Sequence, residues 1–251
     1  MMAPASDGSV RYIWFDQDDT LYNYQDAMKR ALRRCVTAIH ERFPETAGTL
    51  GATELIRVRQ EIVERADRAG MGLIEARCEA FRETLCRFAR PDGLLADTLT
   101  TTYYETLRTG IRPFPGAVDC LRTLSDDGYI LGIVSNGMSL LDELNLAHFF
   151  DHHVYALDLR LYKPDPAIFD HAMSLTGAAP EECLLIGDNR VCDVVGARRA
   201  GWTGVWLNRD GHSWEIEAEP PEHIVTCLTE LPALLTQLNR RRVTHGEHCR
   251  R

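Results

Sequence analysis

The chain has 251 residues, of which 45% are hydrophobic, and a formal net charge of −9. No apolar stretch reaches the ~20 residues of a membrane span, and an acidic body argues against a nucleic-acid groove. The N-terminal residues show no secretory signal, and the eight cysteines form no C-x-x-C pair. We therefore expect reduced thiols and a cytoplasmic protein with neither nucleic-acid nor membrane partners.

An almost wholly apolar run over residues 10–16 predicts a strand buried on both faces, and it ends in Asp16-Gln17-Asp18-Asp19. From Tyr24 to about Arg108, apolar residues recur at helical spacing between charged ones, which predicts an all-helical segment. The turn-rich sequence GIRPFPG follows at residues 110–116.

Strand and helix patterns alternate in the rest of the chain. We expect strands at 129–135, 152–158, 183–188, 202–208 and 223–226, and helices at 138–149, 164–176, 191–200 and 228–238. This alternation predicts an α/β fold, with a doubly wound parallel-sheet (Rossmann-like) core and an inserted all-helical cap domain. The expected core is 1–21 with 111–251, of which 239–251 would be a disordered basic tail, and the expected cap is 22–110.

Polar residues follow four of the expected strands, where doubly wound sheets bind their ligands. They are Asp16–Thr20, Ser135–Gly137, Lys163 and Gly187–Asp193. Lys163 stands out because 26 of the 28 basic residues are arginine and only Lys29 is another lysine. Carboxylates placed close together repel each other, so this lysine and a divalent cation held by oxygen ligands are candidates to offset the repulsion.

Taken together, these segments resemble the haloacid dehalogenase-like hydrolase superfamily. The matching motifs are Asp-x-Asp-x-Thr-Leu from Asp16, the strand-ending Ser135, LYKPDPAIF around Lys163, and Gly-Asp-x-x-x-x-Asp from Gly187. A helical segment between the first two motifs resembles the phosphatase branch that carries an α-helical cap after the first strand. The resemblance covers roughly residues 10–235.

The resemblance implies a role for each motif residue. Asp16 would be the nucleophile that becomes an aspartyl phosphate, and Asp18 would act as general acid and base. Ser135, Asn136 and Lys163 would bind the phosphoryl group, while Thr20 would either contact phosphate or serve the turn. Asp16, Asp188 and the backbone carbonyl of Asp18 would hold Mg²⁺, with Asp193 orienting this site from behind or through water.

The function that these roles imply is Mg²⁺-dependent hydrolysis of a small phosphorylated metabolite. Asp18 argues against dehalogenation, because the dehalogenases of the superfamily carry a different residue at that position. Segments such as VSNG and KPDPAIFDHA resemble nucleoside 5'-monophosphate phosphatases, whereas sugar phosphates and phosphoglycolate are alternative substrates. A phosphomutase would share the four motifs, and a phospho-accepting signalling module is the non-enzymatic alternative.

Substrate specificity would come from the cap, for which the candidates are Tyr22, Tyr24, Arg77 and Arg82. Arg77 and Arg82 lie five residues apart on one expected helix, and a solvated helix face is the alternative interpretation for both. The sequence does not indicate an oligomeric state.

Overall fold

The computed structural model describes residues 9–248, without the side chains of residues 67–69 and 241–248. The described chain divides into two compact units. One holds the residues up to Asn23 together with those from Arg112 onward, and the other spans Tyr24–Ile111. The first unit contains the sheet and the second is helical, so the helical unit is an insertion between the first strand and the remainder of the α/β unit.

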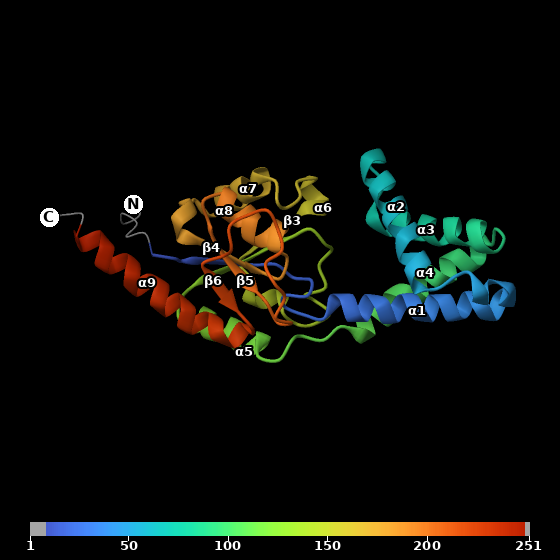
Figure 1. Cartoon of the computed structure of the whole chain (residues 1–251), viewed down its shortest axis with the longest axis horizontal. Helices are drawn as coiled ribbons and strands as arrows, with labels where there is room; N and C mark the ends of the chain where they lie inside the picture. The colour runs from blue at the N-terminus through green and yellow to red at the C-terminus, as the bar shows by residue number, and fades with distance from the viewer. Residues whose placement is uncertain (1–8, 249–251) are drawn as a thin grey trace. The chain divides into compact units, whose positions relative to one another are not determined.

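Among the described residues, six parallel strands form one sheet, in the order β3-β2-β1-β4-β5-β6 (Figure 1). They are β1 (Tyr12–Phe15), β2 (Ile130–Ser135), β3 (His152–Tyr155), β4 (Cys183–Gly187), β5 (Thr203–Leu207) and β6 (His223–Val225). The chain first adds β2 and β3 on one side of β1, and then adds β4 to β6 on the other. The order therefore reverses at the β1–β4 pair, which is the place where open α/β sheets bind ligands.

Helices cover both faces of this sheet, as Figure 1 shows, with α7 and α8 on one side and α5 and α9 on the other. The helices of this unit are α5 (Ala117–Asp126), α6 (Ala156–Leu159), α7 (Pro166–Thr176), α8 (Gly196–Arg199) and α9 (Leu231–His248). Shorter segments are η2 (Ala147–Phe149), η3 (Pro180–Glu182) and η5 (Leu228–Glu230), together with the π-helix η4 (Arg190–Val195). The predicted doubly wound fold class is confirmed.

The central strands are apolar because both of their faces are covered. In β1, Ile13 and Phe15 are fully buried, and Trp14 packs against Trp202 with their ring centroids 5.6 Å apart. Gly132 is the register partner of Trp14 on β2, and a Cβ at position 132 would overlap the indole ring. This glycine therefore leaves the space that the largest side chain of β1 occupies.

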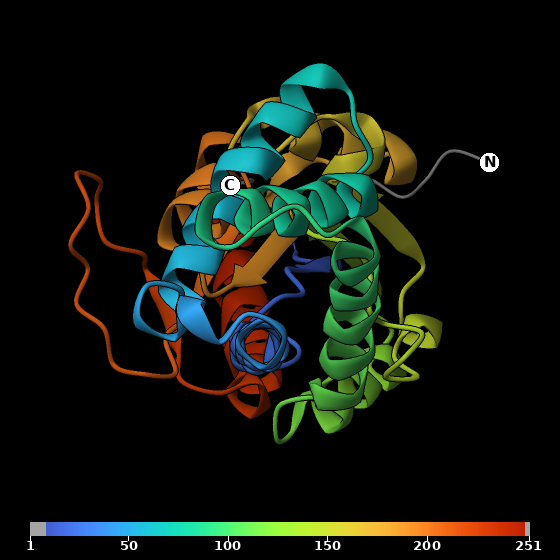
Figure 2. The same cartoon turned by 90° about the vertical axis from the view of Figure 1, so that its right-hand side faces the viewer.

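The helical unit contains α1 (Tyr24–Arg42), η1 (Pro44–Gly48), α2 (Ala52–Ala69), α3 (Leu73–Phe88) and α4 (Gly93–Gly110). In Figure 2, α1 is seen almost along its axis. The unit has an apolar core of its own, to which α1 contributes Leu32 and Ile39 and α4 contributes Leu99 and Leu107, all fully buried. Within the described residues, no helix is both long and apolar enough to span a bilayer.

Four segments differ from the sequence-based expectation. The strand expected over 152–158 ends at Tyr155, and the helix α6 begins at Ala156. The expected helix over 138–149 is wrong, because this segment forms turns that end in η2, and Asn145 has a left-handed φ of 53°. An α-helix cannot continue through that conformation. Helix α5 was not expected, although its buried residues follow helical spacing. Helix α9 continues to His248, so residues 239–248 are helical where a disordered tail was expected, and residues 249–251 lie outside the described part.

We predict that Gly204→Ala destabilises the protein by about 1–3 kcal/mol. A Cβ at this position of β5 would lie 2.8 Å from the carbonyl oxygen of Val194, which is backbone and cannot rotate away. Gly48→Ala is the matched control, because a Cβ at position 48 meets nothing within 4 Å. Urea unfolding of the two variants measures the difference, and equal midpoints would contradict the close β5–η4 approach.

Candidate active site

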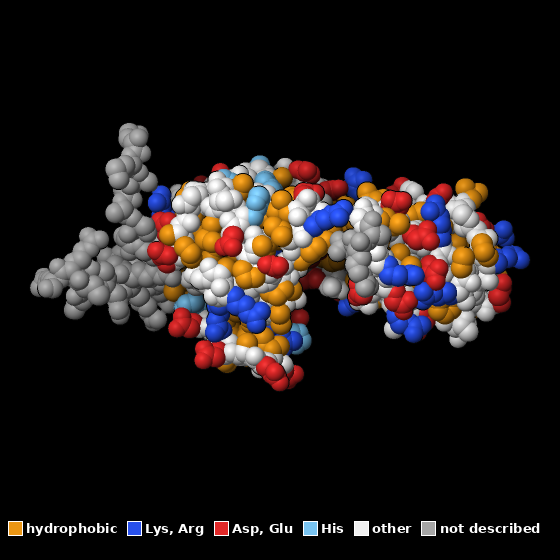
Figure 3. All heavy atoms as spheres, turned by 90° about the horizontal axis from the view of Figure 1, so that it is seen from above, with side chains coloured by type: hydrophobic (Ala, Val, Ile, Leu, Met, Phe, Trp, Pro, Cys, Tyr) orange, Lys and Arg blue, Asp and Glu red, His pale blue; other side chains and the backbone are white. Residues whose placement is uncertain are grey.

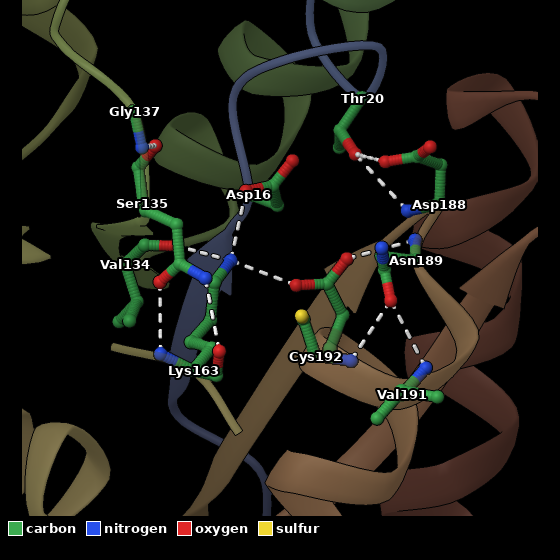
Figure 4. Close-up of polar contacts among 12 residues, drawn as sticks. Asp16, Thr20, Val134, Ser135, Gly137, Lys163, Asp188, Asn189, Val191 and Cys192 are labelled. Carbon is green, nitrogen blue, oxygen red and sulfur yellow. Dashed lines mark hydrogen bonds and ion pairs between the residues drawn. The ribbon is translucent and has the colours of Figure 1, made fainter. Parts of the chain in front are cut away.

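Four segments bring their polar residues together at the carboxyl edge of the sheet (Figure 4). Asp16 follows β1, Ser135 ends β2, and Asp188 follows β4. Lys163 comes from the loop between α6 and α7. The expected gathering of these side chains is therefore present in the structure, because parallel strands end at the same edge.

Lys163 lies at the centre of this group and is only 3% exposed. Its Nζ donates to Asp16 Oδ1 at 2.8 Å, to Asp193 Oδ1 at 2.7 Å and to the carbonyl oxygen of Val134 at 2.7 Å. Burial alone would lower the pKa of Lys163, but the carboxylates of Asp16 and Asp193 outweigh it and raise this pKa above its ordinary value. All three N–H bonds of the ammonium are used, a geometry that the planar guanidinium of arginine does not match.

Asp193 is held by contacts on both of its carboxylate oxygens. Oδ1 accepts from Lys163, and Oδ2 accepts from the backbone N–H of Asn189 at 2.9 Å. A Cβ at Gly187 would overlap this carboxylate, so a glycine is required there. Burial raises the pKa of Asp193 to about 6, against the opposing effect of Lys163. Asp193 therefore contacts Lys163 directly.

Asp188 contacts the segment after β1 through Thr20. Its backbone N–H donates to Thr20 Oγ1 at 3.2 Å, and the Thr20 hydroxyl lies 3.4 Å from Asp188 Oδ1. Asp188 is exposed to solvent on one side. Burial of its carboxylate by surrounding protein atoms raises the pKa of Asp188 to about 7, and the negative charges of Asp16, Asp193 and Asp19 add to this rise. The structure thus places the Thr20 hydroxyl on Asp188.

The turn after β1 directs the first two acidic residues into the site. Asp16 is 8% exposed, and its backbone N–H donates to the carbonyl of Ile186 on β4 at 3.0 Å. Asp18 lies against the turn that follows β2, since a Cβ at Gly137 would be 2.6 Å from Asp18 Oδ2. The two carboxylates therefore border the same space, as residues two apart on an extended backbone should.

The side chains of the turn after β2 bond to nearby backbone groups. The Ser135 hydroxyl accepts from the backbone N–H of Gly137 at 3.1 Å. The side chain of Asn136, however, bonds to the backbone of Lys163 twice, accepting from its N–H at 2.8 Å and donating to its carbonyl at 2.9 Å. The Asn136 amide thus fixes the Lys163 loop, which leaves the backbone N–H of Asn136 as its group for a phosphate.

The acidic side chains form a donor set suited to a small divalent cation. One carboxylate oxygen each from Asp16, Asp188 and Asp193 lies within 4.8 Å of the others. Both oxygens of Asp193 already accept protein hydrogen bonds, whereas in the described residues Asp16 accepts a side-chain hydrogen bond only through Oδ1. The three candidate ligand atoms are carboxylate oxygens, and hard ions such as Mg²⁺ prefer oxygen ligands. The residues present therefore fit Mg²⁺.

The four residues expected to set cap specificity occupy different environments. Tyr22 belongs to the α/β unit, is fully buried, and forms bridges to Asp18 and Pro113, so its expected place in the cap is wrong. Inside the helical unit, Arg77 is 5% exposed and donates to the hydroxyls of Tyr24 at 3.3 Å and Tyr104 at 3.0 Å. Two of the four candidates, Tyr24 and Arg77, are thus joined by a hydrogen bond.

Arg82 lies on an exposed helix surface instead. Its side chain is 47% exposed and pairs with Asp97 at 3.1 Å and Glu79 at 3.6 Å. Figure 3 shows basic and acidic side chains interspersed over the visible face of the helical unit. Such exposed pairs each contribute little to stability, and the pairing matches the solvated face given as the alternative for Arg82.

Sequence reasoning missed two residues that shape the site. Asn189 caps the helical segment after β4, where its side chain accepts from the backbone N–H groups of Val191 and Cys192 at 3.0 and 2.9 Å. An asparagine before a helix is a recognisable capping signal. Arg209 donates to the backbone carbonyls of Asp19 and Thr20, and no local sequence signal indicates this long-range contact.

Comparisons with known proteins show what the chain is similar to. A family model described as "Hydrolase: haloacid dehalogenase-like hydrolase" matches residues 10–201. A glyceraldehyde 3-phosphate phosphatase of Methanopyrus kandleri is 32% identical over 88% of this chain and 98% of its own length. A phosphoglycolate phosphatase of Nitrosococcus oceani is 35% identical, over 49% of this chain and 57% of its own length. A crystal structure of a 2-haloacid dehalogenase from Pseudomonas syringae pv. Tomato DC3000 superposes with a TM-score of 0.72 at 25% identity, covering 91% of this chain and 99% of that one.

We predict that Lys163→Met lowers the free energy of unfolding by about 3–5 kcal/mol, because it leaves buried carboxylates without their counter-charge. Lys29→Met, which removes the other lysine from an exposed helix position, should change it by less than about 0.5 kcal/mol. Denaturant unfolding of both variants measures the difference, and similar values would contradict a structural role for the ammonium.

The destabilisation should also depend on pH. Lys163 opposes the rise in the pKa of Asp193, so its removal raises that pKa further in the folded state alone. A carboxyl group with a raised folded-state pKa stabilises the fold below its unfolded pKa, and that contribution is lost as the pH rises through the folded pKa. The gap between wild type and Lys163→Met should therefore narrow from about pH 8 to about pH 5.

Proposed function

The chain belongs to the haloacid dehalogenase-like hydrolase family, and from this premise we propose that it is a Mg²⁺-dependent phosphomonoesterase that acts through an aspartyl phosphate. The observation that carries the proposal is the meeting of Asp16, Lys163 and Asp188 at one edge of the sheet. A nucleophilic carboxylate, a buried positive charge and a group of carboxylates that can hold a cation are the parts that phosphoryl transfer to an aspartate requires.

Asp16 is the proposed nucleophile. Its Oδ1 accepts from Lys163 Nζ at 2.8 Å, which fixes the orientation of the carboxylate. The attack would come from Oδ2, to which the described residues donate no side-chain hydrogen bond. Attack at phosphorus forms the Asp16–phosphorus bond and breaks the bond to the ester oxygen, and water then cleaves the aspartyl phosphate.

Asp18 is the proposed general acid and base. It lies two residues from the nucleophile and against the turn after β2, where a leaving oxygen would meet it. In the first step it would give its proton to the departing alcohol, and in the second it would take a proton from the attacking water. A carboxylate bordering the site but outside the Lys163 network can change its protonation state without breaking that network.

The transferring phosphoryl group would be stabilised by groups that already point into the site. The Ser135 hydroxyl and the backbone N–H of Asn136 can donate to phosphoryl oxygens. All three N–H bonds of Lys163 are occupied in the structure, so this lysine would act mainly through its positive charge. The phosphate role of Lys163 is therefore neutralisation more than direct hydrogen bonding.

Asp16, Asp188 and the backbone carbonyl of Asp18 are the proposed Mg²⁺ ligands. When bound, the ion supplies positive charge that draws the phosphate and the nucleophile together and offsets the repulsion among the acids. Thr20 would orient the Asp188 carboxylate, and Asp193 would orient Lys163, through the contacts that each already makes. The carboxylates of Asp16 and Asp188, which repel each other, would in this way bind the cation.

The proposed substrate is a small phosphorylated metabolite of the sugar-phosphate class. Two relatives support this class, because they are named for glyceraldehyde 3-phosphate and for phosphoglycolate. The nucleoside 5'-monophosphates expected from the sequence remain a competing class in the substrate test.

We predict that Asp16→Asn lowers turnover by about 10⁴-fold or more, with little loss of stability, since the amide oxygen can still accept from Lys163. Asp19→Asn makes the same charge change three residues away and suits the left-handed φ of 57°, so it should stay active. Phosphate release in Mg²⁺ measures both variants. Near-normal turnover of Asp16→Asn would refute the nucleophile, and a full wild-type rate after exhaustive EDTA treatment would refute the metal.

We further predict that a phosphate-release screen ranks sugar phosphates and phosphoglycolate above nucleoside monophosphates in kcat/KM. The matched comparison holds protein, Mg²⁺ and pH constant and changes only the phosphate ester. A tenfold preference for a nucleotide would overturn the substrate class while leaving the phosphatase assignment intact. Transfer of phosphate between positions of one sugar would indicate a phosphomutase, and a single phosphorylation without turnover would indicate a signalling module.

A further inference from the structure

Arg209 lies outside the four motifs, on the loop that follows β5, and its side chain reaches the segment after β1. Nη1 donates to the backbone carbonyl of Asp19 at 2.6 Å, and Nη2 donates to that of Thr20 at 2.7 Å. Two nitrogens of one planar guanidinium thus hold two consecutive carbonyls, a forked geometry that a lysine ammonium does not offer. These two peptide groups belong to the turn that carries Asp16 and Asp18.

The face of the same guanidinium is fixed as well. Arg209 Cζ lies 3.5 Å from the centroid of the Phe114 ring, at cation–π distance. Phe114 is in turn tied to the β1 segment, because its N–H donates to the carbonyl of Leu21 at 2.9 Å. Arg209 is partly buried, and bonds at its edge together with a ring against its face leave it one orientation.

The turn that Arg209 holds has a backbone conformation that needs support. Asp19 has a φ of 57°, in the left-handed region that costs free energy for residues other than glycine. Inside the turn, Asp19 N–H donates to the carbonyl of Tyr22 at 2.9 Å, and Leu21 N–H donates to that of Gln17 at 2.9 Å. From outside the turn, Arg209 donates to the carbonyls of Asp19 itself and of Thr20.

Thr20 connects this turn to the acid cluster. Its carbonyl accepts from Arg209, while its hydroxyl accepts from the N–H of Asp188 at 3.2 Å. A movement of the Thr20 peptide would therefore shift its contact with Asp188. Arg209 also adds a positive charge near the cluster, because Asp188 and Asp19 are among the carboxylates that interact with it electrostatically.

We propose that Arg209 is a positioning residue for the reaction, because its fork on the Asp19 and Thr20 carbonyls fixes the turn that directs the Asp16 and Asp18 carboxylates into the site. The kinetic consequence rests on the proposed phosphatase function, whereas the positioning itself does not. In the described structure Arg209 donates to the Asp19 and Thr20 carbonyls and not to the Asp16 carboxylate, so it acts through the backbone of the turn.

The kinetic test compares Arg209→Lys, which keeps the charge but loses the fork, with Arg209→Ala. Arg198→Lys is the matched control. Arg198 Nη1 also donates to two consecutive backbone carbonyls, those of Glu219 at 2.7 Å and Pro220 at 3.3 Å, but these lie on the loop between β5 and β6 and not in the turn after β1. We expect both Arg209 variants to lose kcat by about 10–100-fold with KM within about threefold of wild type. Arg198→Lys should keep both constants within about twofold.

Chemical rescue separates positioning from general loss of structure. Guanidinium chloride at millimolar concentration can occupy the space left in Arg209→Ala, and we expect it to restore part of kcat there while leaving wild type unchanged. Thermal unfolding of each variant accompanies the kinetics, and Arg209→Lys carries the test if the alanine variant does not fold. A kcat within about twofold of wild type in Arg209→Lys would overturn the proposal.

Hydrogen exchange tests the same positioning without turnover. We expect amides in a peptide covering residues 16–23 to exchange faster in Arg209→Lys than in wild type or Arg198→Lys, with a peptide covering β4 unchanged. Equal exchange over 16–23 in all three proteins would also overturn the proposal. If wild type releases no phosphate from any substrate, the phosphatase function fails by itself, and hydrogen exchange still decides the role of Arg209.

Discussion

One buried ammonium organises the carboxyl edge of the sheet. Lys163 donates to the nucleophile candidate Asp16, to Asp193 after β4 and to the Val134 carbonyl in β2, so a single nitrogen joins three segments that are far apart in the sequence. The two carboxylates would otherwise repel each other in a region that excludes water, where the repulsion is several times stronger than in solution. The position of each acid therefore depends on this one positive charge, and the rarity of lysine in the chain is consistent with that dependence.

Backbone geometry supplies the rest of the site. Gly187 leaves room for the Asp193 carboxylate, and Gly137 leaves room for Asp18. Arg209 holds the turn after β1 from outside the motifs, and Asn136 holds the Lys163 loop through paired backbone contacts. The side chains proposed to act in the reaction are thus placed by neighbouring groups with no proposed chemical role, and such support gives a site the precision that catalysis needs.

The sequence predicted the parts of this structure that have a local signal. The alternation of strand and helix patterns in the second half of the chain predicted the α/β class. The polar residues after the expected strands, with the isolated Lys163, predicted the gathering of Asp16, Lys163 and Asp188. The expected helix over 138–149 was wrong because its apolar spacing is helical, while Asn145 takes a left-handed conformation that spacing does not reveal. The Arg209 contact depends on two loops meeting after folding, and no pattern within either loop encodes it. Tyr22 was misplaced because the α/β unit continues to Asn23, beyond the end of the Asp-x-Asp-x-Thr-Leu motif.

The two chain segments that connect the helical unit to the α/β unit are hydrogen-bonded to each other. Asn23 N–H donates to the Arg112 carbonyl at 3.2 Å, and the Arg112 N–H donates to Asn23 Oδ1 at 2.7 Å. An insertion whose two ends adjoin adds no long path across the host fold, so its length and sequence are free to diverge while the sheet stays intact. The whole insert could therefore be exchanged as a module at this junction while the α/β unit keeps its fold.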